Sequence, residues 1–182
     1  LETLEKQGII ALHYVKLDAQ GSVDLIHLEE LLKTYPNALV SLMHANNEIG
    51  NLLDIEAVGN LCEQYGAYFH SDTVQTMGHY RHDLKKLNVH GMTAAAHKFH
   101  GPKGVGFMYI NKDKKIKQFV HGGAQERNMR GGTENVYGII GLAKALEICY
   151  REMDEHQAYI TSLKKKMIEQ LKASIPGVSF NG

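Results

Sequence analysis

The sequence has no tryptophan, only two cysteines and three prolines among its 182 residues, and no apolar run long enough to cross a bilayer. Two cysteines cannot form a disulfide framework, which favours a reducing compartment such as the cytoplasm. The 20 basic and 20 acidic residues cancel, so no excess charge indicates a nucleic acid or an anionic membrane as a partner. No signal-peptide pattern opens the chain. We therefore expect a cytoplasmic protein that binds neither nucleic acids nor membranes.

Strand-like and helix-like patterns alternate over the first 110 residues, which is typical of an α/β protein. Residues 38–43 form a short continuous apolar run, the mark of a strand covered on both faces. Apolar residues recur at helical spacing over 25–34, and a second helix is predicted to begin after Asp54 and reach Tyr65. The alternation predicts a mostly parallel sheet with right-handed crossovers. The predicted strands cover residues 9–17, 38–43, 67–69, 91–96 and 105–110.

Three of these predicted strands end in polar residues. The carboxyl ends of parallel strands lie along one edge of a sheet, and ligands bind there in open α/β folds. We therefore expect the three polar clusters to form one site. They are Asn46 and Asn47 after strand 38–43, Asp72 and Gln75 after strand 67–69, and His97 and Lys98 after strand 91–96.

These residue types suit an aromatic aldehyde cofactor that carries a ring nitrogen, a phenolic oxygen and a phosphate. Lys98 would bind the aldehyde covalently. Asp72 would pair with the ring nitrogen and keep it protonated, which makes the ring an electron sink. Gln75 and Asn47 would hydrogen-bond the phenolic oxygen or ring substituents, and His97 would donate to the phosphate together with backbone amides of the turn.

Each of these roles has a plainer alternative. Asp72 and Asn47 could be turn residues that bond their own backbone. His97 could be a partly buried structural histidine, and Lys98 could be a solvated loop lysine, as most lysines are. We prefer the site because the residues are expected to converge from three strand ends.

Two motif-based alternatives are weak. The chain has eleven histidines but neither an HExxH pattern nor paired CxxC motifs, so we expect no metal site. The segment GPKGVG at 101–106 is not a phosphate-binding P-loop, because the spacing of its glycines and lysine is wrong and the lysine precedes the glycine pair.

The C-terminal third has a different organisation. The lysine-rich residues 112–117 predict a solvated hairpin or loop, and a helical pattern runs from Asn135 to about Ser174. A strand-like stretch, 178–180, follows it. We expect residues 1–150 to be the central part of a large cofactor-binding domain. Residues 151–182 would continue the long helix and open a small C-terminal α+β domain.

Four segments occur in an order and at spacings that resemble the cysteine desulfurases, which belong to the class V aminotransferase (fold type I) superfamily of pyridoxal 5'-phosphate (PLP) enzymes. The resemblance covers nearly the whole chain and implies a three-layer α/β/α large domain. The block ERNMRGGT favours the branch that supplies sulfur for iron–sulfur cluster assembly and tRNA thiolation. The four segments are NNEIG (46–50), FHSDTVQ (69–75), AHKFHGPKGVG (96–106) and HGGAQERNMRGGTEN (121–135).

The resemblance implies a role for each candidate residue. Lys98 becomes the catalytic, PLP-binding lysine and Asp72 the partner of the pyridine nitrogen. His97 would bind the phosphate, as would Thr133, reaching across from the other subunit of a homodimer. The other cofactor-binding residues are Asn47 and Gln75. Enzymes of this kind convert L-cysteine to L-alanine and pass the sulfur as a persulfide to acceptors such as an iron–sulfur scaffold protein.

The chain also departs from the family pattern. Ala95 stands where many members carry a phosphate-binding Ser or Thr. The N-terminal phosphate loop would precede Leu1, and the persulfide cysteine would follow Gly182, so the resemblance implies a fragment without its flanks. Cys62 and Cys149 fall in predicted helices and are expected to be packing residues.

Two alternatives remain open. Another fold type I enzyme, such as a selenocysteine lyase or an aminotransferase, would share the lysine and aspartate but is not expected to carry the 121–135 segment. An inactive desulfurase-like fragment that acts as a dimerising scaffold would also fit the missing cysteine and Ala95.

Overall fold

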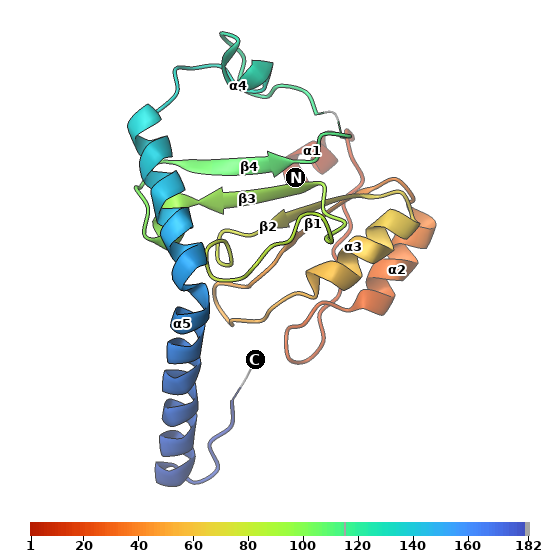
Figure 1. The fold of residues 1–182 in the computed structure, drawn as a ribbon. Coiled ribbons are helices and arrows are strands. Elements are labelled where there is room, and N and C mark those ends of the chain that lie inside the picture. The colour runs from red at the N-terminus through yellow and green to blue at the C-terminus, as the bar shows by residue number, and fades with distance from the viewer. Residues whose placement is uncertain (115, 181–182) are drawn as a thin grey trace.

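The computed structural model describes residues 1–114 and 116–180 and contains a four-stranded sheet (Figure 1). The strands are β1 (Leu39–Met43), β2 (Tyr68–Asp72), β3 (Gly91–Ala95) and β4 (Gly106–Ile110), in the order β1-β2-β3-β4. β1, β2 and β3 run parallel, whereas β4 is antiparallel to β3. No crossover helix separates β3 from β4, and an antiparallel return needs none. The predicted α/β class and the mostly parallel sheet are confirmed.

Two capped helices cover one face of the sheet. Helix α2 (Leu25–Thr34) begins where the Asp24 carboxylate accepts hydrogen bonds from the next turn, and Asp54 does the same for α3 (Ile55–Gln64). Their apolar sides are fully buried against the strands and form the core. The main contributors are Leu28 and Leu32 from α2, Val58 and Cys62 from α3, and Val40, Phe69, Met92 and Ala94 from the sheet.

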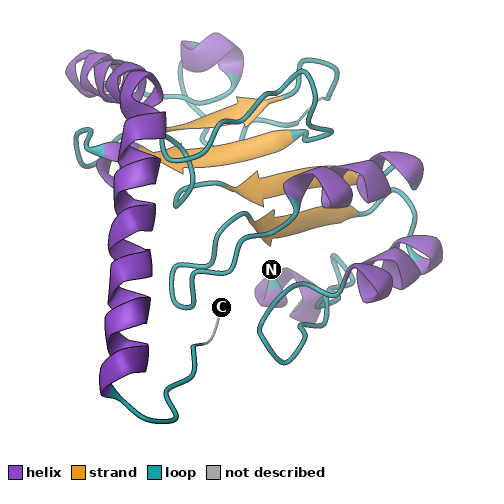
Figure 2. Ribbon diagram, turned by 60° about the horizontal axis from the view of Figure 1, so that its bottom comes forward, coloured by secondary structure: helices purple, strands orange, loops and turns teal. Residues whose placement is uncertain are grey.

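The long helix α5 (Val136–Ser174) lies on the side of the sheet towards which β1 to β3 point, next to the end of β3 (Figures 1 and 2). Asn135 caps its first turn, accepting a hydrogen bond from the Gly138 amide. Only its first half is packed on the core, through residues such as Leu142 and Cys149. The second half is exposed. The helix continues without a break across the domain boundary predicted at residue 150, and that boundary stays a prediction.

The opposite face of the sheet is more open among the described residues. Leu39 of β1 is 62% exposed, while its neighbour Val40 is 7% exposed. The expectation that residues 38–43 are covered on both faces is therefore wrong for this part of the chain. The strand alternates because the packed helices lie on the Val40 face alone.

Three other expectations need correction. Residues 9–17 form no strand, because only an isolated bridge between Leu17 and Val23 gives this segment a pairing partner. β2 is longer than predicted, so Asp72 is the last residue of the strand instead of lying in the following turn. Residues 178–180 are not assigned to a strand, and residues 181–182 lie outside the described residues.

Two short helices lie away from the core. Helix α1 (Glu2–Lys6) is followed by Gly8, which has a positive φ of 68°. Helix α4 (Gln125–Asn128) belongs to a segment that loops out beyond the edge strand β4 (Figure 1). Before it, residues 112–114, 116 and 117 form a loop or turn, as predicted, while residue 115 lies outside the described residues.

Candidate functional site

The ends of β1, β2 and β3 lie side by side, as the sequence predicts. Asp72 is in register with Met43 on one side and with Thr93 on the other. Two backbone hydrogen bonds extend this pairing beyond the strands, from the His44 amide to the Asp72 carbonyl (2.8 Å) and from the Thr73 amide to the Thr93 carbonyl (3.1 Å). The segments that follow the three strands therefore begin at one edge.

Lys98 lies in a single 3-10 turn, η1 (Ala96–Phe99), directly after β3. Ala96 and Phe99 have no exposed surface, whereas His97 and Lys98 are exposed. The turn closes at His100, whose φ is +66°, and the Gly101 amide donates to the Ala96 carbonyl (2.8 Å). A Cβ on Gly101 would lie 2.8 Å from that of Ala96, so this position needs glycine. The lysine is thus presented to solvent from a firmly anchored turn.

Asp72 has the turn role that was one of its two predicted roles, and its site role stays a prediction. Its Oδ1 accepts a hydrogen bond from the Val74 amide (2.9 Å), while Oδ2 accepts none from the described residues. The side chain is half-buried. One oxygen therefore holds the turn, and the other is free for a cationic donor.

The two asparagines differ. Asn46 is a turn residue, because its Oδ1 accepts from the amides of Glu48 (2.8 Å) and Ile49 (3.1 Å). Asn47 is exposed, and its amide donates to the Glu48 carboxylate (2.7 Å). Asn47 would have to exchange this contact in order to bind a cofactor.

Gln75 lies in the turn after β2, between two threonines with no exposed surface. The Thr73 hydroxyl donates to the Thr93 carbonyl (2.8 Å), which ties this turn to β3. Thr133 is exposed and lies between α4 and α5, in a segment that Figure 1 shows beyond β4. The described chain does not bring Thr133 to the strand ends, and its contact with a partner's site stays a prediction.

Sequence reasoning missed a buried group beneath these turns. His44 Nδ1 lies 2.9 Å from the Thr76 hydroxyl and 3.1 Å from His82 Nε2. Burial and the neighbouring His82 lower the pKa of His44 from 6.5 to about 4, and burial also lowers the pKa of His82. Both rings are therefore neutral at pH 7. A histidine directly after an apolar strand was the signal for this group, but its partners are 32 and 38 residues away.

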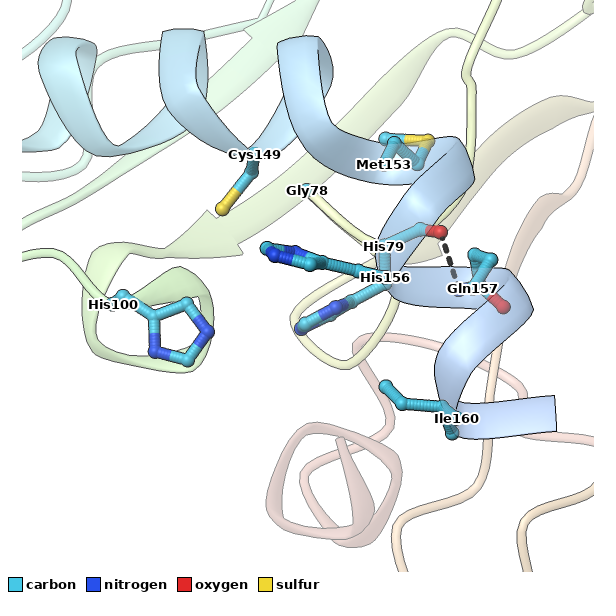
Figure 3. Close-up of a pocket in the computed structure, with 8 residues that line it drawn as sticks. All are labelled: Gly78, His79, His100, Cys149, Met153, His156, Gln157 and Ile160. Atoms are coloured by element: carbon cyan, nitrogen blue, oxygen red, sulfur yellow. Dashed lines mark hydrogen bonds between the residues drawn. The ribbon is translucent and has the colours of Figure 1, made fainter. Parts of the chain in front are cut away.

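Sequence reasoning also missed the contacts behind η1. His79 Nε2 lies 3.0 Å from the Lys98 carbonyl, and the Gln157 amide of α5 donates to the His79 carbonyl (2.7 Å). Cys149 Sγ contacts the Phe99 carbonyl (3.5 Å). A pocket of about 10 Å³, roughly the space of one water, is lined here by side chains that include His79, His100, Cys149, His156 and Gln157 (Figure 3).

Neither cysteine is suited to carry sulfur. Cys62 has no exposed surface, and burial raises the pKa of its thiol to about 12. Burial, with Glu152 nearby, also raises the pKa of Cys149. A thiol must ionise to act as a nucleophile, so the prediction of packing cysteines is confirmed.

A search of residues 1–114 and 116–180 found no group of three or more His, Cys, Asp or Glu placed to hold a metal ion. Within the same ranges, no helix is long and apolar enough to span a membrane.

The residues at this edge fit a PLP-type cofactor by their chemistry. An exposed primary amine, a carboxylate with one free oxygen and two amide side chains follow strands that end side by side. One donor is missing. Ala95, at the N-terminal end of η1, has no side-chain hydroxyl to offer a phosphate.

Comparison with known proteins agrees with this chemistry. The chain is 42% identical over 179 residues to a cysteine desulfurase IscS of Clostridium botulinum and 44% identical to that of Dictyoglomus turgidum, each alignment covering 98% of this chain. Among solved structures, a NifS-like protein matches 93% of the chain with a TM-score of 0.85 and 41% identity. A NifS-like protein from Rickettsia africae matches 92% with a TM-score of 0.84 and 34% identity.

The chain spans less than half the length of these relatives, 45% of each IscS sequence and 47–49% of the two structures. The family model for aminotransferase class V matches residues 1–182. Enzymes of this family depend on PLP. The chain therefore belongs to the aminotransferase class V family, and its relatives include cysteine desulfurases.

Proposed function

We propose that the protein is a PLP-dependent cysteine desulfurase, which converts L-cysteine to L-alanine and passes the sulfur on as a persulfide. The observation that carries this proposal is the position of Lys98, exposed on a buried turn at the edge where Asp72 ends the neighbouring strand. The relatives named IscS support cysteine as the substrate, and a structure described as SspA in complex with cysteine matches 80% of the chain at 32% identity.

Each residue has a task in this proposal. Lys98 Nζ holds the cofactor covalently and, when free, moves the proton at the substrate α-carbon. Asp72 Oδ2 would accept a hydrogen bond from the protonated ring nitrogen. His97, exposed beside Lys98, donates to the phosphate. When bound, PLP supplies the electron sink that stabilises negative charge at the α-carbon.

Asn47 and Gln75 hydrogen-bond the phenolic-oxygen side of the ring. Thr133 contributes to the phosphate site of the other subunit in a homodimer, which its exposed position permits. Neither Cys62 nor Cys149 accepts the sulfur in this proposal, because both are buried. The proposed setting is iron–sulfur cluster assembly or tRNA thiolation in the cytoplasm.

The direct test measures alanine formed from L-cysteine by the full-length protein. Lys98→Ala is expected to lose this activity completely. Lys103→Ala, at an exposed lysine in the following turn, is the matched control and should retain it. Alanine formation from selenocysteine but not from cysteine would favour a selenocysteine lyase. No turnover of either by a PLP-loaded protein would favour the inactive scaffold.

A further inference from the structure

We propose that His79 is a positioning residue for Lys98. Its imidazole donates a hydrogen bond to the Lys98 carbonyl and so fixes the turn that aims the lysine side chain. This inference rests on the proposed function, since it assumes that Lys98 is the lysine that binds PLP. His79 lies in the turn after β2, 19 residues before Lys98.

The lysine turn, η1, is stabilised by hydrogen bonds from residues elsewhere in the chain. A four-residue 3-10 helix leaves carbonyls at its C-terminal end without intrahelical partners, and no side chain caps its N-terminal end. The Ala96 carbonyl is bonded by the Gly101 amide. The Lys98 and Phe99 carbonyls are instead contacted by His79 Nε2 (3.0 Å) and Cys149 Sγ (3.5 Å). A thiol is a weak donor, so the 3.5 Å contact of Cys149 contributes little. The Lys98 carbonyl therefore depends mainly on His79, which lies 19 positions away in the sequence.

The hydrogen bond has one direction only. A carbonyl oxygen accepts and cannot donate, so His79 Nε2 carries the proton. The backbone amide and the backbone carbonyl of His79 are both hydrogen-bonded as well. Its amide donates to the Thr76 carbonyl (3.0 Å), and its carbonyl accepts from the Gln157 amide of α5 (2.7 Å), the dashed contact in Figure 3.

The turn that carries His79 also packs tightly against η1. Gly78 has a φ of +81°, and a Cβ there would lie 2.7 Å from Phe99 Cβ and 3.3 Å from Cys149 Cβ. This close approach fixes the separation between His79 and Lys98. α5, the 76–79 turn and the lysine turn therefore form one connected unit, in which a change at His79 is transmitted to Lys98.

The test uses the full-length protein with PLP as the probe and compares three variants. His79→Leu removes the donor but keeps an apolar side chain of moderate size. His79→Gln places an amide nitrogen at a similar reach and restores a donor. His156→Leu is the matched control, because His156 lines the same small pocket but contacts Glu152 (3.7 Å) instead of Lys98.

The readouts are the rate of covalent PLP attachment, kcat and KM for L-cysteine, and hydrogen exchange of the His100 and Gly101 amides without cofactor. We expect His79→Leu to slow attachment and lower kcat about ten-fold, the worth of one hydrogen bond, with KM changed less than about two-fold. The two amides should exchange faster. His79→Gln should recover most of each loss, and His156→Leu should match the wild type.

Unchanged attachment and exchange in a folded His79→Leu protein would overturn the inference. So would a His79→Gln protein that is as impaired as His79→Leu. Failure of the proposed function is a separate result, since it would show as no attachment that depends on Lys98 in the wild type. The exchange measurement needs no cofactor, and it would still decide whether His79 holds the turn.

Discussion

The exposed residues of the candidate site and the layer beneath them are built differently. Asn47, His97 and Lys98 are exposed, whereas Thr73, Thr76 and Phe99 below them have no exposed surface. Of the exposed residues, Asn47 follows β1, and His97 and Lys98 follow β3. The buried residues are held by hydrogen bonds and packing between segments far apart in the chain. The proposed function thus relies on accessible groups whose positions are fixed by buried neighbours.

The largest expected effect is at Asp72, the half-buried last residue of β2. Asp72→Asn keeps an oxygen for the Val74 amide but removes the negative charge proposed to keep the cofactor ring protonated. We expect kcat of the full-length enzyme to fall about a hundred-fold, the scale of losing one preorganised electrostatic partner. Asp113→Asn, at an exposed loop position, should leave kcat unchanged. Equal activity of the two variants would remove Asp72 from the site.

The second prediction tests the buried layer. Phe99→Ala opens a cavity under the lysine turn and should lower the free energy of unfolding by about 3–5 kcal/mol, measured by urea denaturation. Phe119→Ala removes the same aromatic ring from a residue that is 92% exposed. It should change the free energy of unfolding by less than about 0.5 kcal/mol. Similar values for the two would show that η1 is not anchored as described.

The third prediction concerns pH and the His44–His82 pair. The folded chain lowers the pKa of His44 from 6.5 to about 4, so the unfolded chain binds more protons between these values. The contribution of neutral His44 to the free energy of unfolding is therefore fully present above pH 6.5. It falls as the pH is lowered towards 4, by up to about 3 kcal/mol. The buried Thr76 hydroxyl and the His82 ring face His44, and Glu56, Arg81, Asp83 and Lys86 line the adjoining cavity of about 300 Å³.

Urea unfolding at pH 7 and pH 4.5 measures this effect. His44→Asn should flatten the difference between the two pH values, while His121→Asn, at an exposed residue, should preserve it. An unchanged pH dependence in His44→Asn would assign the acid sensitivity to other groups.

The smallest effect is expected at the cysteines. Cys62→Ala and Cys149→Ala should each leave desulfurase activity of the full-length protein within about two-fold of the wild type, since neither buried thiol ionises near pH 7. Alanine formation measured with dithiothreitol as sulfur acceptor provides the check. Complete loss of activity in a folded variant would contradict the packing role.

Local signals were sufficient for much of the fold. α2 was predicted at its observed bounds from the helical spacing of its apolar residues and from Pro36 after its end, and the structure adds the cap by Asp24. The shared edge of three strand ends also followed from the alternation of strands and helices. In contrast, residues 9–17 have strand-like composition and remain unpaired, since a strand requires a neighbour that the local sequence does not specify.

The candidate site also combines residues that the local sequence predicts with contacts that it does not. Asp72, His97 and Lys98 stand out because each interrupts an apolar pattern at a strand end. The contact of His79 with Lys98 and that of His44 with His82 could not be predicted, because they join segments 19 and 38 residues apart through turn geometry. Whether Thr133 reaches a partner's site depends on a second copy of the chain.

The most direct measurement incubates the protein with PLP, reduces it with borohydride and locates the added mass by peptide mass spectrometry. The account predicts a single pyridoxyl-modified lysine, Lys98, and a visible absorption band before reduction that Lys98→Ala lacks. Modification of another lysine, such as Lys103, or a band that persists in Lys98→Ala, would contradict the central claim that the turn after β3 presents the cofactor-binding lysine.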